Sequence, residues 1–152
     1  DDLGDKKLKC DMKNKEFLTW EEAEKQADFC HEYQEGVYEY RIKGKGRTLV
    51  EDGQVLIEGA DWVDWYKKGV YRYEIIGKGC TLIEDGKVVI EGVVWVGWFE
   101  KGVYEYKIKG EGYTLVEDGE VLVEGADDVY WSEKGVYRCK MKGGDWVKIN
   151  NK

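Results

Sequence analysis

The chain has 152 residues, of which 42% are hydrophobic and 14% aromatic, and its formal net charge is −8. This much apolar surface excludes a disordered chain, and no apolar run approaches the ~20 residues that a membrane span needs. Because the chain is acidic and has no cluster of lysines and arginines, we also exclude nucleic acid and anionic membranes as partners.

Residues 1–35 form the most acidic part of the chain, with eleven acidic against six basic side chains. Residues 1–16 show no periodicity and predict an extended lead. The segment from Thr19 to Glu22 has the pattern of a helix capping box, in which the first hydroxyl and the last carboxylate each accept from the other residue's amide. Apolar residues follow at helical spacing as far as Cys30. We therefore predict a short helix over 19–35 that caps the rest of the chain.

From Gly36 onward the sequence repeats with a step of 33 residues, and the unit returns at Gly69, at Gly102 and, shortened, at Gly135. The first and third units agree at 24 of 33 positions, which indicates a repeat architecture rather than a chance likeness. We predict a mainly β domain over 36–152, built as a linear array of antiparallel meander repeats, three full and one partial. The predicted repeats are 36–68, 69–101, 102–134 and the partial 135–152.

Each unit is expected to contain four strands joined by short glycine turns. In the first unit, Val37 to Lys43 alternates apolar and charged residues, which is typical of a half-buried strand. Asp52-Gly53 favours a two-residue type I′ turn and so predicts a β-hairpin. A fourth strand, Trp62 to Lys67, leads into the next unit. The alternative fold is a closed β-trefoil, in which the partial unit would leave surplus strands.

The first strand of each unit carries a charge at one fixed position, and its sign alternates along the chain: Glu39, Arg72, Glu105 and Arg138. Opposite charges on neighbouring strands attract, so this pattern favours units that lie side by side in register. We interpret it as a linear stack in which each unit contacts the next at equivalent positions.

The segment from Glu117 to Tyr130, followed by Lys134 to Tyr137, resembles bacterial WG (KWG) repeats. Those repeats have a similar length and combine a glycine-containing turn, a strand, a DG turn, a hydrophobic strand and an Asp-Asp-aromatic element. The resemblance extends over Gly36–Lys152. It implies a β-rich repeat domain that binds other proteins and has no catalytic activity of its own.

One face of the predicted fourth strand varies between units that otherwise match, so stacking does not require it. In the first two units this face carries Trp62, Tyr66, Trp95 and Phe99. We predict that these four residues form an exposed aromatic strip that binds another protein or stacks on sugar rings. The alternative is that the N-terminal helix covers the strip.

The sequence favours a non-catalytic binding or structural module. A lectin-like carbohydrate binder and a subunit that self-assembles through open sheet edges are the alternatives. An enzyme is not expected, because the chain has a single histidine, His31, and its near-identical units place carboxylates in like environments. The acidic turns lack the six oxygen ligands that Ca²⁺ requires, so we expect neither a metal nor a cofactor.

The four cysteines, Cys10, Cys30, Cys80 and Cys139, form no CxxC pair and are disulfide candidates. Cys10 is placed to pair with Cys30, whereas the other two either pair with each other or are both buried thiols. The even count and the polar start without methionine favour a secreted or cell-surface protein.

Overall fold

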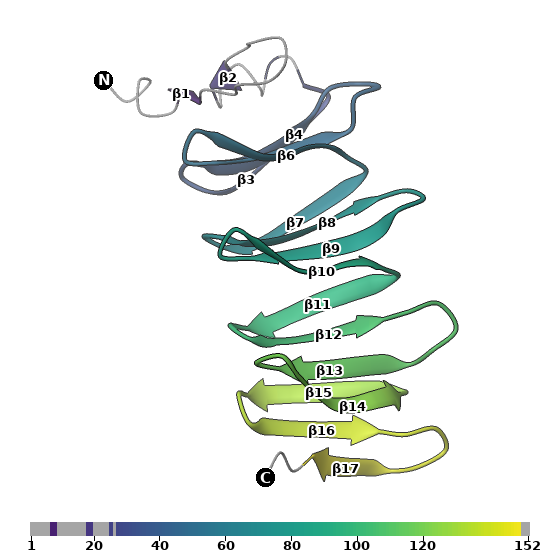
Figure 1. Ribbon diagram of the computed structural model, residues 1–152. Coiled ribbons are helices and arrows are strands. Elements are labelled where there is room, and N and C mark those ends of the chain that lie inside the picture. Colours follow the sequence, from purple (N-terminus) through teal and green to yellow (C-terminus); the bar gives the residue numbers. More distant parts are fainter. Residues whose placement is uncertain (1–6, 9–17, 20–24, 26, 150–152) are drawn as a thin grey trace. The chain divides into compact units, whose positions relative to one another are not determined.

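A computed structural model describes residues 7–8, 18–19, 25 and 27–149. The protein is mainly β, with antiparallel sheets, as the repeats predicted (Figure 1). The chain divides into two compact units, Asp1–Gly77 and Lys78–Lys152. In the described part of the chain, no helix has the length and apolar character needed to cross a bilayer.

The first unit contains a four-stranded antiparallel sheet with the order β3-β4-β5-β6, a hairpin of β7 with β8, and a short pairing of β1 with β2. β7 lies against β5, and β8 lies against β6. The bounds are β1 Lys7–Leu8, β2 Leu18–Thr19, β3 Phe29–Gln34, β4 Val37–Arg41, β5 Arg47–Glu51, β6 Gln54–Ala60, β7 Trp62–Lys67 and β8 Val70–Ile75.

The second unit contains a hairpin of β9 with β10, a four-stranded sheet with the order β11-β12-β13-β14 and a three-stranded sheet with the order β15-β16-β17. The bounds are β9 Gly79–Glu84, β10 Lys87–Val93, β11 Trp95–Glu100, β12 Val103–Lys107, β13 Tyr113–Glu117, β14 Glu120–Ala126, β15 Asp128–Glu133, β16 Val136–Lys140 and β17 Trp146–Ile149. Its core includes Val103, Leu115 and Tyr137, which bring β12, β13 and β16 together.

The predicted Asp-Gly hairpin turns are confirmed. Asp52, Asp85 and Asp118 have φ angles of 49°, 54° and 48°, and the glycine after each also has a positive φ. Two successive positive φ angles define the type I′ turn, whose twist matches that of the strands it joins. The turn residues therefore determine where each hairpin reverses.

Strand β4 was expected to be half-buried, but both of its faces are covered. Val37, Tyr38, Glu39 and Tyr40 are all buried. One face belongs to an apolar cluster around Tyr38, Tyr40 and Val50, while the other face contains the carboxylate of Glu39. A charged residue is tolerated there because it is paired with a cation, as described below.

The prediction of a helix over 19–35 is wrong for its second half, because Phe29–Gln34 is strand β3. The strand forms because its side chains alternate across the sheet and its backbone pairs with β4, with Phe29 opposite Arg41. Thr19 ends strand β2, and the remaining positions of the predicted capping box, 20–22, lie outside the described residues.

The β-trefoil alternative is also wrong. It requires a closed barrel, whereas in the described residues the first and last strands of each sheet are not hydrogen-bonded to each other. The physical reason is the connectivity. Each short turn adds the next strand beside the previous one, so a sheet grows as an open meander with two edges.

Candidate binding surface on the last sheet

A glutamate directly before each of the first two Asp-Gly turns forms a carboxylate clamp. In the first unit, Glu51 accepts hydrogen bonds from the Trp65 indole and the Gly69 amide, both at 3.0 Å. In the second unit, Glu84 accepts from the Trp98 indole at 2.8 Å and from the Gly102 amide at 2.9 Å. These glutamates are therefore engaged in holding adjoining strands together.

The third copy of this clamp is different. The indole nitrogen of Trp131 is buried and has no hydrogen-bond partner in the described part of the chain. Glu117 instead accepts a hydrogen bond of 2.6 Å from the Tyr137 hydroxyl. Burial, together with this hydrogen bond, raises the pKa of Tyr137 to about 12. The sequence repeat thus preserves both the carboxylate and the tryptophan, but the third copy does not form the hydrogen bond from the indole.

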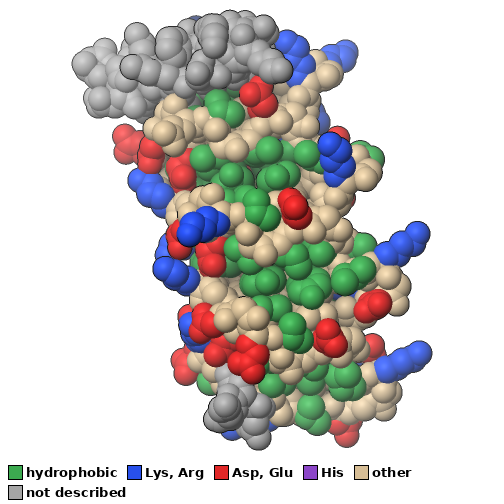
Figure 2. Space-filling view, in the orientation of Figure 1, with side chains coloured by type: hydrophobic (Ala, Val, Ile, Leu, Met, Phe, Trp, Pro, Cys, Tyr) green, Lys and Arg blue, Asp and Glu red, His purple; other side chains and the backbone are tan. Residues whose placement is uncertain are grey.

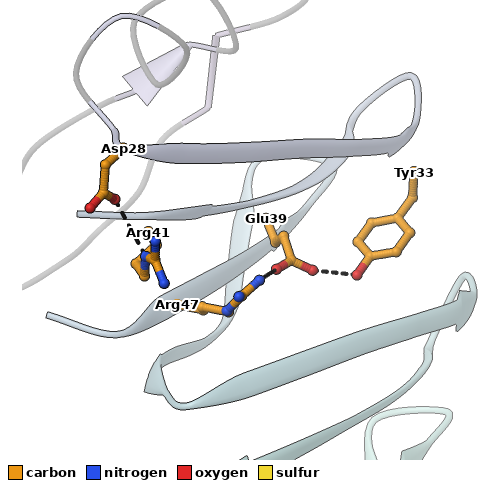
Figure 3. A network of polar contacts seen from close by, with 5 residues as sticks. All are labelled: Asp28, Tyr33, Glu39, Arg41 and Arg47. Atoms are coloured by element: carbon orange, nitrogen blue, oxygen red, sulfur yellow. Dashed lines mark hydrogen bonds and ion pairs between the residues drawn. The ribbon is translucent and has the colours of Figure 1, made fainter. Parts of the chain in front are cut away.

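Glu39 lies at the centre of a second polar network, shown in Figure 3. The Glu39 residue is only 2% exposed, and its carboxylate pairs with Arg47 at 2.7 Å and accepts a hydrogen bond from the Tyr33 hydroxyl. The Arg47 guanidinium also lies over the Phe29 ring, 4.4 Å from its centroid. Burial, followed by the bond to Glu39, raises the pKa of Tyr33. The buried charge is therefore compensated on two sides.

Glu105, in the third repeat, occupies the position equivalent to Glu39 and has no such compensation. It is 9% exposed, and its Oε1 atom is buried without a hydrogen-bond partner in the described residues. Two repeat steps of 33 residues place Tyr113 where Arg47 stands and Phe99 where Tyr33 stands. Burial, with a smaller contribution from Asp128, raises the pKa of Glu105 to about 7.

Two of the alternating charges, Glu39 and Arg72, form ion pairs within their own sheets. Glu39 pairs with Arg47 of β5, and Arg72 pairs with Asp64 of β7 at 3.1 Å. The predicted attraction between equivalent positions of successive units stays a prediction.

Two of the four predicted aromatic site residues, Trp62 and Tyr66, are half-buried in the first unit. The Arg72 guanidinium lies 4.7 Å from the Trp62 ring centroid and 5.4 Å from that of Tyr66. Arg72 therefore brings these two rings together around one cation. In the first unit these two rings therefore pack around one cation while remaining partly exposed, and their role in binding stays a prediction.

The other two predicted residues, Trp95 and Phe99, are half-buried in the second unit and have different neighbours. Trp95 meets the Tyr113 ring edge-on at 5.8 Å and lies over Gly97, where a Cβ atom would come within 2.5 Å of its ring. Phe99 stacks on Trp131, with ring centroids 5.3 Å apart. The rings of Trp95 and Phe99 therefore each pack against another aromatic ring of the same unit.

The exposed aromatic residues lie elsewhere. Figure 2 shows hydrophobic side chains at the surface of both units. On the last sheet, β15-β16-β17, Tyr130 is 56% exposed and Trp146 is 43% exposed. Together with Arg138, they line a cavity of about 260 Å³.

This face is buried in the earlier four-stranded sheets. Leu49 and Leu115 are completely buried, whereas the equivalent position in the last sheet is the exposed Lys148. Val103 is also completely buried, but its equivalent Val136 is 41% exposed. The last sheet therefore presents to solvent a surface that its counterparts bury.

Two cations lie directly opposite each other on this face. In the pairing of β16 with β17, Arg138 is opposite Lys148, and in the pairing of β15 with β16 it is opposite Tyr130. Neither cation has an ion-pair partner among the residues that the structure describes. Like charges directly opposite each other on paired strands are destabilising. The corresponding pair in β12 and β13, Glu105 with Leu115, contains no such like-charge repulsion. The row Tyr130-Arg138-Lys148 is suited to binding an anion.

The sequence analysis did not select Tyr130, Arg138 or Trp146 as site residues. A signal for them exists in the repeat itself, because a step of 33 from Leu115 reaches Lys148 rather than another leucine. An apolar core position that becomes charged in the last copy indicates that this copy does not bury the same face.

Cys80 and Cys139 are buried, Cys30 is half-buried, and the Cys80 thiol donates a hydrogen bond of 3.4 Å to the Val94 carbonyl. The two alternatives for Cys80 and Cys139, a disulfide or two buried thiols, stay predictions. Burial raises the pKa of the Cys139 thiol. The predicted partner of Cys30, Cys10, lies outside the described residues. No group of three or more His, Cys, Asp or Glu residues in the described part of the chain could hold a metal ion.

Comparisons with known proteins found no matching family model, no matching curated protein and no matching solved structure.

Proposed function

We propose that this chain is a non-catalytic binding module whose last sheet binds another protein. The observation that carries the proposal is the outer face of that sheet, where Tyr130, Arg138 and Trp146 surround a cavity and remain open to solvent. Tyrosine, tryptophan and arginine are the residues that most often dominate binding energy at protein interfaces. The opposed cations Arg138 and Lys148 favour an anionic partner.

The proposed architecture is a linear array of 33-residue repeats, three full and one partial. It is supported by the first strands, which begin at Val37, Val70, Val103 and Val136. It is also supported by the clamps of Glu51 and Glu84, which have the same spacing to their donors. The resemblance to WG repeats and a secreted or surface location belong to the same proposal.

A carbohydrate ligand is the second candidate, because the exposed rings of Tyr130 and Trp146 could stack on a sugar. The facing cations favour a protein partner over a neutral sugar, since hydroxyl groups offer no charge to offset their repulsion. Self-association through sheet edges is the third candidate, and solution mass measurements test it directly.

The proposal is tested by screening the full chain against a displayed library of extended peptides and against a glycan array. We expect carboxylate-containing peptides to bind the wild type, and Trp146→Ala or Arg138→Ala to weaken binding at least tenfold. Ile76→Ala is the matched control, because Ile76 is 77% exposed and belongs to the first unit. Selection of glycans only, or equal binding by all variants, would contradict the proposal.

A further inference from the structure

We infer that the partner binds as an extended acidic segment that adds a strand beside β17, and this inference rests on the proposed function. The segment would hydrogen-bond to the backbone of Trp146–Ile149 and place a carboxylate next to Lys148 and Arg138. This is the strand-addition mode of peptide recognition, in which the backbone supplies affinity and alternate side chains supply specificity.

The first step of the argument is the position of β17 in its sheet. β5 lies between β4 and β6, and β13 lies between β12 and β14. β17 follows β13 by one repeat step, yet among the described strands it pairs only with β16. The amide and carbonyl groups of β17 that point away from β16 therefore lie at a sheet edge, where an added strand can hydrogen-bond to them.

The second step is the exposure of the side chains. Thr48 of β5 and Thr114 of β13 are 6% and 7% exposed, with a strand on each side. Their counterpart in β17, Val147, is 51% exposed. An apolar residue at an open edge favours a partner that covers it, because its burial removes apolar surface from water.

The third step concerns the chemistry of the added strand, for which β14 is the template. Val123 of β14 pairs with Leu115 of β13, so the residue at the Val123 position of an added strand would face Lys148. An acidic residue there would form an opposite-charge pair with Lys148 and offset its repulsion from Arg138. The preceding positions would remain apolar, as Val121 and Leu122 are in β14.

Charge also distinguishes this partner from a second copy of the chain. Antiparallel pairing of β17 with another β17 would bring together two strands that each carry Lys148, beside an arginine on each β16. Like charges on paired strands oppose such a contact. The favoured occupant is therefore an acidic segment of a different protein.

The test uses a peptide with the sequence of Gly119–Ala126 in which Val123 is replaced by Glu, and a control peptide in which Val123 is replaced by Lys. Titration of the full chain at low salt, followed by calorimetry and amide NMR, measures affinity and location. We expect the acidic peptide to bind at least tenfold more tightly than the basic one, and β17 amides that point away from β16 to gain protection from exchange. With Lys148→Glu in the protein, the preference should reverse.

Each alternative outcome identifies a different error. Failure of both peptides to bind, or an unchanged preference with Lys148→Glu, overturns the inference, while the library screen judges the proposed function separately. Binding that requires Arg138 but protects no β17 amide overturns strand addition and leaves a protein-binding face in place. Concentration-dependent protection of β17 without peptide identifies a second copy as the occupant and also overturns the inference.

Discussion

Glu39 and Glu105 stand at equivalent positions of two nearly identical repeats and are both buried, yet their electrostatic surroundings are opposite. Glu39 pairs with Arg47, whereas one oxygen of Glu105 has no partner in the described residues. Glu39 lies on β4 and Glu105 on β12, and each of these strands contains five residues. The comparison shows that strands of equal length surround both carboxylates, while the state of each buried charge depends on the side chains at two variable neighbouring positions.

The largest effect should come from removing the compensated charge. Glu39→Leu is expected to lower the free energy of unfolding by about 3 kcal/mol, because it leaves Arg47 without its carboxylate. Glu105→Leu should be neutral or stabilising, since it removes a buried group that has an unpaired oxygen. Urea unfolding of both variants measures the difference, and equal losses would show that the two sites are alike.

A double variant serves as the control for this prediction. Glu39→Leu combined with Arg47→Met should recover part of the lost stability, because both members of the pair are then apolar. A loss that remains undiminished in the double variant would mean that packing, rather than the unpaired cation, causes the effect.

The next effect is a dependence of stability on pH. The pKa of Glu105 is raised from 4.5 to about 7 in the folded chain, so between these values the folded state binds more protons than the unfolded state. Its contribution to stability therefore falls as pH rises from about 4.5 to about 7. Glu105→Gln should be more stable than wild type by about 2 kcal/mol at pH 8 and should show less of this fall. Thermal unfolding between pH 4.5 and pH 8 checks both statements, and parallel curves for the two proteins would contradict them.

A smaller effect is expected at the carboxylate clamps. Trp65→Phe removes a donor to Glu51 and should cost about 1–2 kcal/mol, whereas Trp131→Phe removes a buried indole nitrogen that has no partner. The second substitution should therefore change stability by less than about 0.5 kcal/mol. Unfolding free energies that rank the two variants the other way would show that packing of the ring outweighs the hydrogen bond.

The smallest effect should appear on the open face of the last sheet. Lys148→Glu converts the like-charge pair with Arg138 into an opposite-charge pair and should stabilise the chain by about 0.2–1 kcal/mol. Lys148→Gln should give part of this gain and serves as the control. A gain that persists in 1 M salt would argue against an electrostatic origin, because exposed charges are screened there.

Much of the fold follows from local rules that the sequence displays. Asp52-Gly53 and its copies determine the hairpin turns, because both positions require positive φ. The repeat step also contained information that the helix prediction overlooked. Tyr33-Gln34-Glu35-Gly36 aligns with Tyr66-Lys67-Lys68-Gly69, which indicates that β3 is an earlier copy of β7. The capping-box pattern outweighed this longer-range signal, although tertiary pairing with β4 decides the conformation.

The candidate site depended on tertiary structure to a greater degree. The repeat shows that the face with Trp62, Tyr66, Trp95 and Phe99 varies between units, but it does not show what covers these rings. Their neighbours include Arg72, Gly97 and Trp131, which the fold brings beside them.

The order of residues along the chain thus established the strand class, the turn positions and the period, because these depend on neighbours a few positions apart. Side chains from strands that are distant in sequence decide which carboxylate is paired, which indole lacks a hydrogen-bond partner among the described residues and which sheet face is open. Short-range chemistry is visible in a string of letters, whereas burial and pairing arise only when the sheets pack.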